Sequence, residues 1–495
     1  MKDSKSGDGV REDPVNIPLL EEYLSPATTL QLNHHNEIRD DLLSRVWVES
    51  KKFWKIAGPS IVIRIASYSI LVITQAFAGH LGDLELAAVS VSITVVIGFT
   101  FGLLLGMASA LETLCGQAYG AKKYRMLGIY LQRSWVVLTL CAILLLPVYI
   151  FTAPILKLLG QPDDLAELTG LFTNWLTPLP FALALQMPSQ RFLQCQRKTS
   201  IVAWVCLGAL LFHILLIWSV VYKLGFGVIG AAAILNVSWW IIVLGSFSYI
   251  ACGGCPETWT GFSMEAFSGL WEFFKLSMAS GVMLCLENWY YMILVLMTGN
   301  LSNAKVAVSA LTICMSINGW EVMIPLAFFA ATGVRVANEL GAGNGKAAKF
   351  ATKVSVVTSL IIGIFFCALI MIFHEKLAII FTSSVVILQA VDNLAFLLAC
   401  TVLLNSIQPV LSGVAVGSGW QASVAFINIG CYYIIGIPLG VALGWVFHLG
   451  VRGIWSGMIG GTAIQTLILI IITIRCDWDM HAQIASSRMN MLSNS

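Results

Sequence analysis

Long apolar stretches separated by short polar segments follow one another along almost the whole chain after residue 50. A helix that crosses a lipid bilayer needs about 20 mostly apolar residues. The stretches are continuous and do not alternate in segments of about ten residues, which excludes a transmembrane β-barrel. The pattern therefore predicts an all-α integral membrane protein with twelve transmembrane helices, at residues 53–79, 87–115, 126–150, 166–188, 201–222, 228–251, 271–298, 306–333, 352–373, 385–414, 421–446 and 453–475.

The composition agrees with lipid as the main solvent of the chain. Of the 495 residues, 58% are hydrophobic and 11% are charged, whereas soluble domains carry about 25% charged residues. The formal net charge of +2 provides no electrostatic footprint for DNA or RNA. A soluble enzyme, a disordered protein and a nucleic-acid binder are therefore excluded, and we expect the lipid bilayer as the main partner.

The two ends of the chain are more polar than the rest. Residues 1–50 lack the apolar core of a signal peptide, and we expect them to form a disordered cytosolic tail. Residues 479–495 are expected to form a second cytosolic tail. Most of the 12 cysteines lie in apolar stretches and act as small hydrophobic residues. Cys252 and Cys255 lack the further ligands of a zinc site, so we expect no bound metal.

Basic residues predict the orientation of the chain in the membrane. They cluster in the loops after the second, fourth and eighth spans, whereas the opposite loops carry isolated charges. Loops rich in Lys and Arg face the cytosol, which places both termini there as well. The basic cluster residues are Lys122, Lys123, Arg125, Arg191, Arg197, Lys198, Arg335, Lys346, Lys349 and Lys353.

The second half of the chain repeats the first. Gly120 aligns with Gly341 and Pro188 with Pro409, at an offset of about 220 residues that persists across six spans. Repeats of six spans share one orientation, which indicates two lobes related by a pseudo-two-fold axis along the membrane normal. This arrangement is typical of a secondary transporter, and the seven scattered histidines suggest no catalytic cluster. The predicted lobes are residues 51–255 and 256–478, and we expect a monomer.

Ionisable residues at membrane depth indicate function, because burying them in lipid is costly. Glu287 lies near the middle of the seventh span and Glu321 lies in the eighth. A carboxylate in a medium of low dielectric constant takes up a proton readily, so both are candidates for proton coupling; the alternative is a structural pairing with a neighbouring helix. Further charges at depth, candidates for gating or structural roles, are Glu112, Asp392 and their possible cationic partners Arg64 and Arg335.

Polar and aromatic residues accompany these acids in the second lobe. Asn405 and Gln408 can hydrogen-bond a ligand without selecting for charge, and Pro409 can act as a hinge in the tenth span. Aromatic rings can stack on a flat organic molecule. The predicted substrate is therefore a small organic solute, with further candidate contacts from Asn288, Trp289, Tyr290 and Trp320.

Two segments resemble signatures of a known family. Residues 111–120, Leu-Glu-Thr-Leu-Cys-Gly-Gln-Ala-Tyr-Gly, look like the span-two signature of eukaryotic MATE (multidrug and toxic compound extrusion) transporters. Residues 335–343, Arg-Val-Ala-Asn-Glu-Leu-Gly-Ala-Gly, look like their span-eight signature. The resemblance covers roughly residues 45–480, and the motifs together are similar to the plant DETOXIFICATION branch.

The resemblance implies two six-helix lobes around a V-shaped cavity, and exchange of protons for organic solutes with no other cofactor. Glu287 matches a span-seven glutamate that takes part in proton coupling in this family. Many plant members place an aspartate where this chain has Asn405. Either Glu287 carries the proton alone, or Glu321 shares the role. The Asn variant in residues 403–417 resembles the sub-branch of TRANSPARENT TESTA type vacuolar flavonoid carriers.

The leading hypothesis is a proton-coupled antiporter that moves flavonoid-like solutes across the vacuolar membrane, the plasma membrane being the less favoured location. One alternative is a chloride-type anion transporter or channel-like protein, with Asn405, Gln408 and Arg64 lining the path. Another is an antiporter of alkaloids or other organic cations, with Glu287 and Glu321 as direct ligands.

Overall fold

A computed structural model of the chain describes residues 26–299, 304–382 and 384–493, and every regular element in these ranges is a helix. The chain forms two compact units, residues 1–51 and residues 52–495. The described part of the first unit lies in α1 (Pro26–Gly79), where residues 41–48 are exposed to solvent.

The prediction that residues 1–50 are disordered is wrong for residues 26–50, which are helical; residues 1–25 lie outside the described ranges. The physical reason is local. Residues 27–50 contain neither Gly nor Pro, both of which disfavour a helix interior. The single proline, Pro26, is the first helical residue, the position where its missing N–H costs nothing. Asp41 and Arg45 also pair across one turn, 3.9 Å apart.

The second unit contains two groups of helices, which we call the first and the second lobe. The helices of the first lobe after α1 are α2 (Asp83–Val91), η2 (Ser92–Ile97), α3 (Gly98–Gly120), α4 (Tyr124–Ile150), α5 (Thr152–Leu158), α6 (Asp163–Trp175), α7 (Leu179–Cys195), α8 (Thr199–Ile217), η3 (Trp218–Lys223), α9 (Gly227–Tyr249) and η4 (Ile250–Gly254). The short 3₁₀ helix η5 (Met264–Phe267) lies in the segment that connects the lobes.

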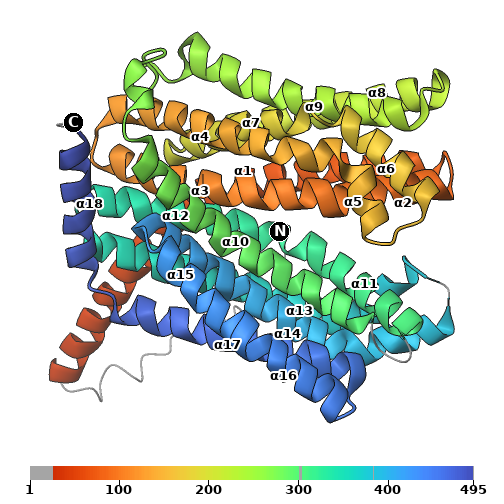
Figure 1. The fold of residues 1–495 in the computed structure, drawn as a ribbon. Coiled ribbons are helices and arrows are strands. Elements are labelled where there is room, and N and C mark those ends of the chain that lie inside the picture. Colours follow the sequence, from red (N-terminus) through yellow and green to blue (C-terminus); the bar gives the residue numbers. More distant parts are fainter. Residues whose placement is uncertain (1–25, 300–303, 383, 494–495) are drawn as a thin grey trace, which may run out of the picture. The chain divides into compact units, whose positions relative to one another are not determined.

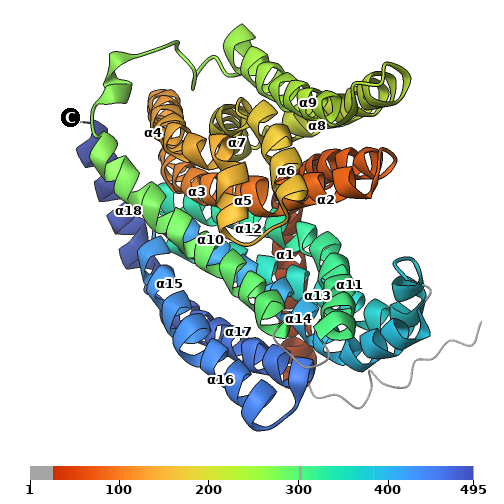
Figure 2. The ribbon, with the colours of Figure 1, turned by 45° about the vertical axis from the view of Figure 1, so that its right-hand side comes forward.

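The second lobe repeats this order of elements. Its helices are α10 (Leu270–Thr298), α11 (Ala304–Glu321), α12 (Met323–Gly341), α13 (Gly345–Ile379), α14 (Val385–Ser418), α15 (Gln421–Asn428), η6 (Ile429–Gly436), α16 (Ile437–Val441), η7 (Ala442–Val446) and α17 (Gly450–Arg475). The chain ends with α18 (Trp478–Ser493), which packs on α12 and α13. In Figures 1 and 2, α3, α10 and α12 run between the remaining helices of the two lobes.

The described residues include eleven helical segments that are long and apolar enough to cross a membrane, and twelve when the bent pair α6–α7 is taken as one span. The axes of α6 and α7 differ in direction by 51°. The bend lies at Pro178 and Pro180, which remove backbone donors and clash with the preceding turn. The predicted fourth span is thus broken. In the predicted eighth span, α11 and α12 are separated by the single residue Val322, and together they form one continuous span, Val306–Gly341.

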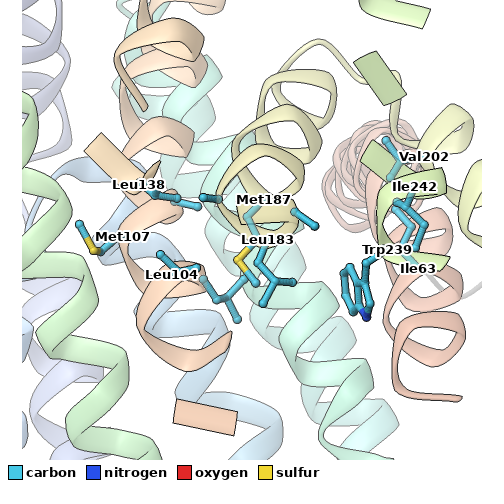
Figure 3. Close-up of a cluster of buried hydrophobic side chains, with 14 of the residues drawn as sticks. Ile63, Leu104, Met107, Leu138, Leu183, Met187, Val202, Trp239 and Ile242 are labelled. Carbon is cyan, nitrogen blue, oxygen red and sulfur yellow. The ribbon is translucent and has the colours of Figure 1, made fainter. Parts of the chain in front are cut away.

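The core of the first lobe is apolar and closely packed. Figure 3 shows a cluster of its buried side chains, which come from α1, α3, α4, α7, α8 and α9. The same cluster continues into α12 and α14 of the second lobe, for example at Phe328 and Val410. A separate cluster within the second lobe includes Tyr290 and Trp455. The first apolar cluster therefore extends across both lobes, and the second cluster lies within the second lobe.

Candidate functional site

Glu287 lies on α10 at the centre of a polar network in the second lobe. Its carboxylate is within hydrogen-bonding range of the Gln408 side chain of α14, and Gln408 donates to the Ser412 hydroxyl at 3.1 Å. One turn along α10, the Tyr291 hydroxyl donates to Oδ1 of Asn405 at 2.8 Å. The Asn405 amide in turn donates to Oδ1 of Asn318 on α11 at 3.1 Å. The network thus joins α10, α11 and α14.

Glu321 is the last residue of α11, and the single residue Val322 separates it from α12. Pro325 has no backbone N–H to bond the carbonyl of Glu321, four residues earlier, while the bonds from Val322 to Asn318 and from Leu326 to Val322 continue the helix. The Glu321 side chain is buried, and its Oε2 has no hydrogen-bond partner among the described residues. It lies one turn beyond Asn318, and its charge acts on Tyr291 together with that of Glu287. The structure therefore brings both predicted acids to one network.

Neither acid forms an ion pair with a cation in the part of the chain that the structure describes. A carboxylate in apolar surroundings without a cationic partner is stabilised by taking up a proton. The polar groups around Glu287 are amides and hydroxyls, which can donate to the ionised form or accept from the protonated one. This arrangement can therefore bind and release a proton.

Three candidate substrate residues lie where the lobes face each other. Trp289 stacks on Phe99 of α3 with ring centroids 6.0 Å apart. Trp320 packs edge-on against Tyr68 of α1 at 4.9 Å. Both tryptophans remain more than two-fifths exposed, at 44% and 43%. Asn288 is also exposed and lies against Gly102 of α3. These accessible groups border the carboxylate network and can reach a solute between the lobes.

Tyr290 does not belong with these residues. Its ring is buried, stacks on Tyr432 at 4.4 Å, and its hydroxyl donates to the carbonyl of Met458 at 2.7 Å. The predicted substrate contact at Tyr290 is therefore a packing contact inside the second lobe. Tyr291 contacts the network instead, through its bond to Asn405. Its spacing of four residues from Glu287, which is visible in the sequence, places it on the same helix face.

Pro409 lies within α14, beside the network. The carbonyl of Asn405 loses its usual helical donor there, because proline has no N–H. A neighbouring helix supplies a compensating contact, since the Ser359 hydroxyl of α13 donates to the adjacent carbonyl of Ser406. Such side-chain support is how membrane helices tolerate proline. The position fits the predicted hinge, and the helix continues to Ser418.

Glu112 forms a buried ion pair with Arg191. From the sequence, Arg191 is expected in a basic loop. The two side chains are 0% and 1% exposed, and the Arg191 guanidinium lies 2.9 Å from the Glu112 carboxylate. Arg191 also donates to Gln194 at 3.0 Å. Pro188 does not end the helix, so α7 carries Arg191 back into the lobe. Arg64 lies close enough to act electrostatically on both partners.

Arg335 was predicted as a possible partner for the acids at depth, and that pairing stays a prediction. Its guanidinium bonds Glu339 of the same helix, four residues away, at 2.6 Å. Asp392 lies at the other end of the second lobe, where it bonds His374 at 2.7 Å with an exposed side chain. With Glu375 these residues form a solvent-facing group that offers three metal-ligand atoms within 4.8 Å.

The segments 111–120 and 335–343 meet where the two lobes touch. Gly120 of α3 lies on the backbone of Asn338, and Gly341 of α12 lies on the backbone of Gln117; a side chain at either glycine would collide there. We call this part the basic end, because Lys122 and Lys123 follow Gly120 closely in the sequence and Lys346 follows Gly341.

Hydrogen bonds cross between the lobes at the basic end. Thr113 donates to the carbonyl of Val416 at 2.5 Å, and Gln117 donates to that of Gly417 at 3.1 Å. The Asn338 amide donates to the carbonyl of Cys195 at 3.3 Å. The Gln421 amide donates to the Thr113 hydroxyl at 2.7 Å. The basic end is therefore closed in this structure, and these contacts must separate for a path to open there.

Comparisons with known proteins agree with this geometry. A family model described as MatE matches residues 59–219 and 279–442. Protein DETOXIFICATION 27 of Arabidopsis thaliana is 62% identical over 491 residues, which cover 99% of each chain. Protein DETOXIFICATION 26 of the same plant is 60% identical over 490 residues, or 98% of each chain. The crystal structure of the eukaryotic MATE transporter AtDTX14 matches with a TM-score of 0.86 and 36% identity, over 90% of this chain and 99% of that one.

Proposed function

Since the chain belongs to the MATE family, we propose that it is a proton-coupled antiporter in which Glu287 carries the proton. Family membership confirms the predicted fold class and the prediction of a multi-pass membrane transporter of small organic solutes that is not an enzyme. The coupling ion, the membrane and the solute belong to the proposal.

The observation that carries the proposal is the position of Glu287 in a network that connects three helices. An ionised carboxylate accepts from the Gln408 amide, whereas a protonated one also offers an O–H donor. The protonated form can keep the bond from Gln408 at its carbonyl oxygen, while its new O–H takes a further acceptor, so protonation changes the hydrogen bonding between α10 and α14. Tyr291 and Asn405 lie one turn away from Glu287 and Gln408 on the same two helices, and their bonds to each other and to Asn318 extend the polar contacts to α11, which ends at Glu321. Protonation can thus alter the packing of the helices that border the other lobe.

We place the basic end at the cytosol, because loops rich in Lys and Arg face that side. In this orientation the closed contacts at Thr113, Gln117 and Asn338 seal the cytosolic side. The structure then corresponds to the state that faces the opposite compartment. In a vacuolar membrane that compartment is acidic, so Glu287 would be protonated from the lumen and would release its proton to the cytosol.

The exposed Trp289 and Trp320 support a flat aromatic solute, because indole rings stack on extended π systems. Asn288 adds an uncharged hydrogen-bonding group beside them. We propose flavonoid-like solutes on this basis. The Glu287 carboxylate lies beside the Gln408 amide and Glu321 is buried, so we assign both to the proton rather than to a cationic solute.

Transport by proteoliposomes with an imposed pH gradient tests the proposal. The wild-type protein should take up a flavonoid glycoside when the interior is acidic, and uptake should stop when the gradient is dissipated. Glu287→Gln should remove the gradient-driven component. Glu272→Gln is a matched control on the same helix, because Glu272 is exposed and pairs only with Lys275 at 3.0 Å among the described residues.

Retention of full gradient-driven uptake by Glu287→Gln would refute the role of Glu287. Large anion currents that ignore the pH gradient, measured by patch clamp on isolated vacuoles, would instead identify a channel-like protein.

A further inference from the structure

A small cavity lies inside the first lobe, away from the network around Glu287. Its volume is about 20 Å³, which is room for one water-sized species. The apolar part of its wall includes Ile63, Met187 and Ile242. Figure 3 shows Ile63 and Ile242 beside the Trp239 ring. The polar part of its wall comes from α1, α7 and α9 and contains Arg64, Ser67, Gln186, Gln190 and Trp239.

The donors around this cavity lack partners within the protein. The Arg64 side chain is buried, at 7% exposure, and it has no hydrogen bond or ion pair with the described residues. Both polar atoms of the buried Gln186 amide are also unpartnered, as is the indole nitrogen of Trp239. Buried polar groups are nearly always satisfied. The cavity therefore presents unpartnered donors from Arg64, Gln186 and Trp239 against one unpartnered acceptor, Gln186 Oε1, which favours a ligand that mainly accepts hydrogen bonds.

The charges of the lobe interior indicate the sign of that ligand. Arg64 and Arg191 are both buried cations, and Glu112 is the one buried anion beside them. His213 does not add an anion, because it is a neutral or cationic group held by Thr74 at 3.2 Å and Ser238 at 2.8 Å. Two buried cations, Arg64 and Arg191, thus share one buried carboxylate, Glu112. A buried uncompensated charge is costly, and an anion at Arg64 would neutralise it.

We propose that this cavity binds one small monovalent anion of about the size of chloride, held by Arg64, Gln186 and Trp239. A small volume excludes an organic solute, and a guanidinium, an amide and an indole N–H supply donors and no competing carboxylate. The inference concerns a site in the first lobe and does not depend on the proposed role of Glu287 in the second.

The internal repeat gives this site a position relative to the proton site. Ser67, in the wall of the cavity, aligns with Glu287 at the offset of about 220 residues. Arg64 lies one turn before Ser67 on α1, so the two halves of the repeat carry a guanidinium and a carboxylate within one turn of corresponding positions.

Thermal unfolding of the purified full chain in detergent tests the site. The midpoint is measured in increasing sodium chloride and in sodium gluconate at the same sodium concentration, with sodium bromide and sodium formate as further arms. A ligand that binds only the folded state raises the midpoint in a saturable way. Chloride and bromide should do so, and gluconate, which is too large for the cavity, should not.

Variants place the effect at the cavity. Arg64→Gln should abolish the chloride-dependent shift, and Gln186→Leu should weaken the apparent affinity about tenfold by removing one hydrogen bond to a charged group. Arg133→Gln is the control, because Arg133 is an arginine of the same lobe that bonds the carbonyl of Glu265 at 3.1 Å instead. It should lower the midpoint in both salts and leave the chloride shift unchanged.

Equal midpoints in chloride and gluconate for the wild-type protein would overturn the proposal, and so would a full chloride shift in both cavity variants. Stabilisation by formate without stabilisation by chloride would overturn the assignment to a halide-sized ion. If Arg64→Gln does not fold, the affinity of Gln186→Leu decides the matter. The measurement involves no transport, so its failure leaves the proton proposal standing.

Discussion

The buried ion pair of Glu112 and Arg191 shows how much one charged residue can contribute to the stability of the folded protein. Removing one partner of a buried pair leaves the other charge uncompensated, which costs about 3–5 kcal/mol. Glu112→Gln should therefore lower the unfolding midpoint strongly and reduce the yield of folded protein in size-exclusion chromatography. The exposed pair of Lys157 and Glu167, at 2.8 Å, is the comparison, because Lys157→Gln should change the midpoint little. An equal, small effect of both substitutions would contradict this account of the buried pair.

At the same scale, the sequence identifies residues whose chemistry is unusual for their position. Glu287 and Glu321 are carboxylates in apolar stretches, and the structure brings both to one network. Arg191 could not be found in this way, because its neighbours in sequence belong to a basic loop while the helix carries it inward. The unpartnered donors of Gln186 and Trp239 are visible only once the packing is known.

At the scale of elements, the contact between α3 and α12 depends on Gly120 and Gly341. Gly120→Val would force the backbones apart, and overpacking of this kind costs about 1–3 kcal/mol. The fraction of molecules in which the basic end is open should then rise about tenfold or more. A hydrophilic thiol reagent should accordingly label the buried Cys195 faster in the variant, while the exposed Cys252 reacts equally in both proteins. Unchanged labelling of Cys195 would show that this contact does not hold the basic end closed.

The docking of α18 should depend on pH. Its His481 accepts a hydrogen bond from the Trp420 indole at 3.3 Å. Burial lowers the pKa of His481 below its usual value, against a smaller opposing effect of Asp477. The undocked state therefore binds the proton more readily, so the docked state loses stability as pH falls below about 6.5.

Amide hydrogen exchange measures this effect. Exchange in residues 478–487, corrected for the intrinsic rate, should be faster at about pH 5.5 than at about pH 7.5. His481→Gln keeps an acceptor for the indole and does not titrate, so its exchange should be independent of pH over this range. A wild-type segment with the same protection at both values would exclude His481 as the cause.

The positions of the long helices follow largely from the lengths of the apolar stretches in the sequence. The predicted spans coincide with the long helices, because each span must satisfy its own backbone in lipid. Their interruptions are less predictable. The chain bends by 51° near Pro178 and Pro180, whereas α14 continues through Pro409 and the span Val306–Gly341 continues past Pro325. The sequence shows each proline but not the packing around it that decides between a bend and a continuous helix.

At the scale of the whole molecule, the orientation proposed from Lys and Arg can be measured at one cysteine. Cys252 is exposed at the end of α9, next to the segment that connects the lobes. In intact vacuoles, a membrane-impermeant maleimide added to the cytosolic side should label the wild-type protein and should not label Cys252→Ser. Labelling that appears only after the vacuoles are lysed would reverse the proposed topology.

The central claim is that Glu287 exchanges a proton for each transport cycle, and solute-driven proton movement tests it most directly. Acid-loaded proteoliposomes carry a pH-sensitive dye inside, and a flavonoid glycoside is added outside. The account predicts that the internal pH rises with wild-type protein and with Glu272→Gln, and stays constant with Glu287→Gln. A rise of the same rate with Glu287→Gln would contradict it.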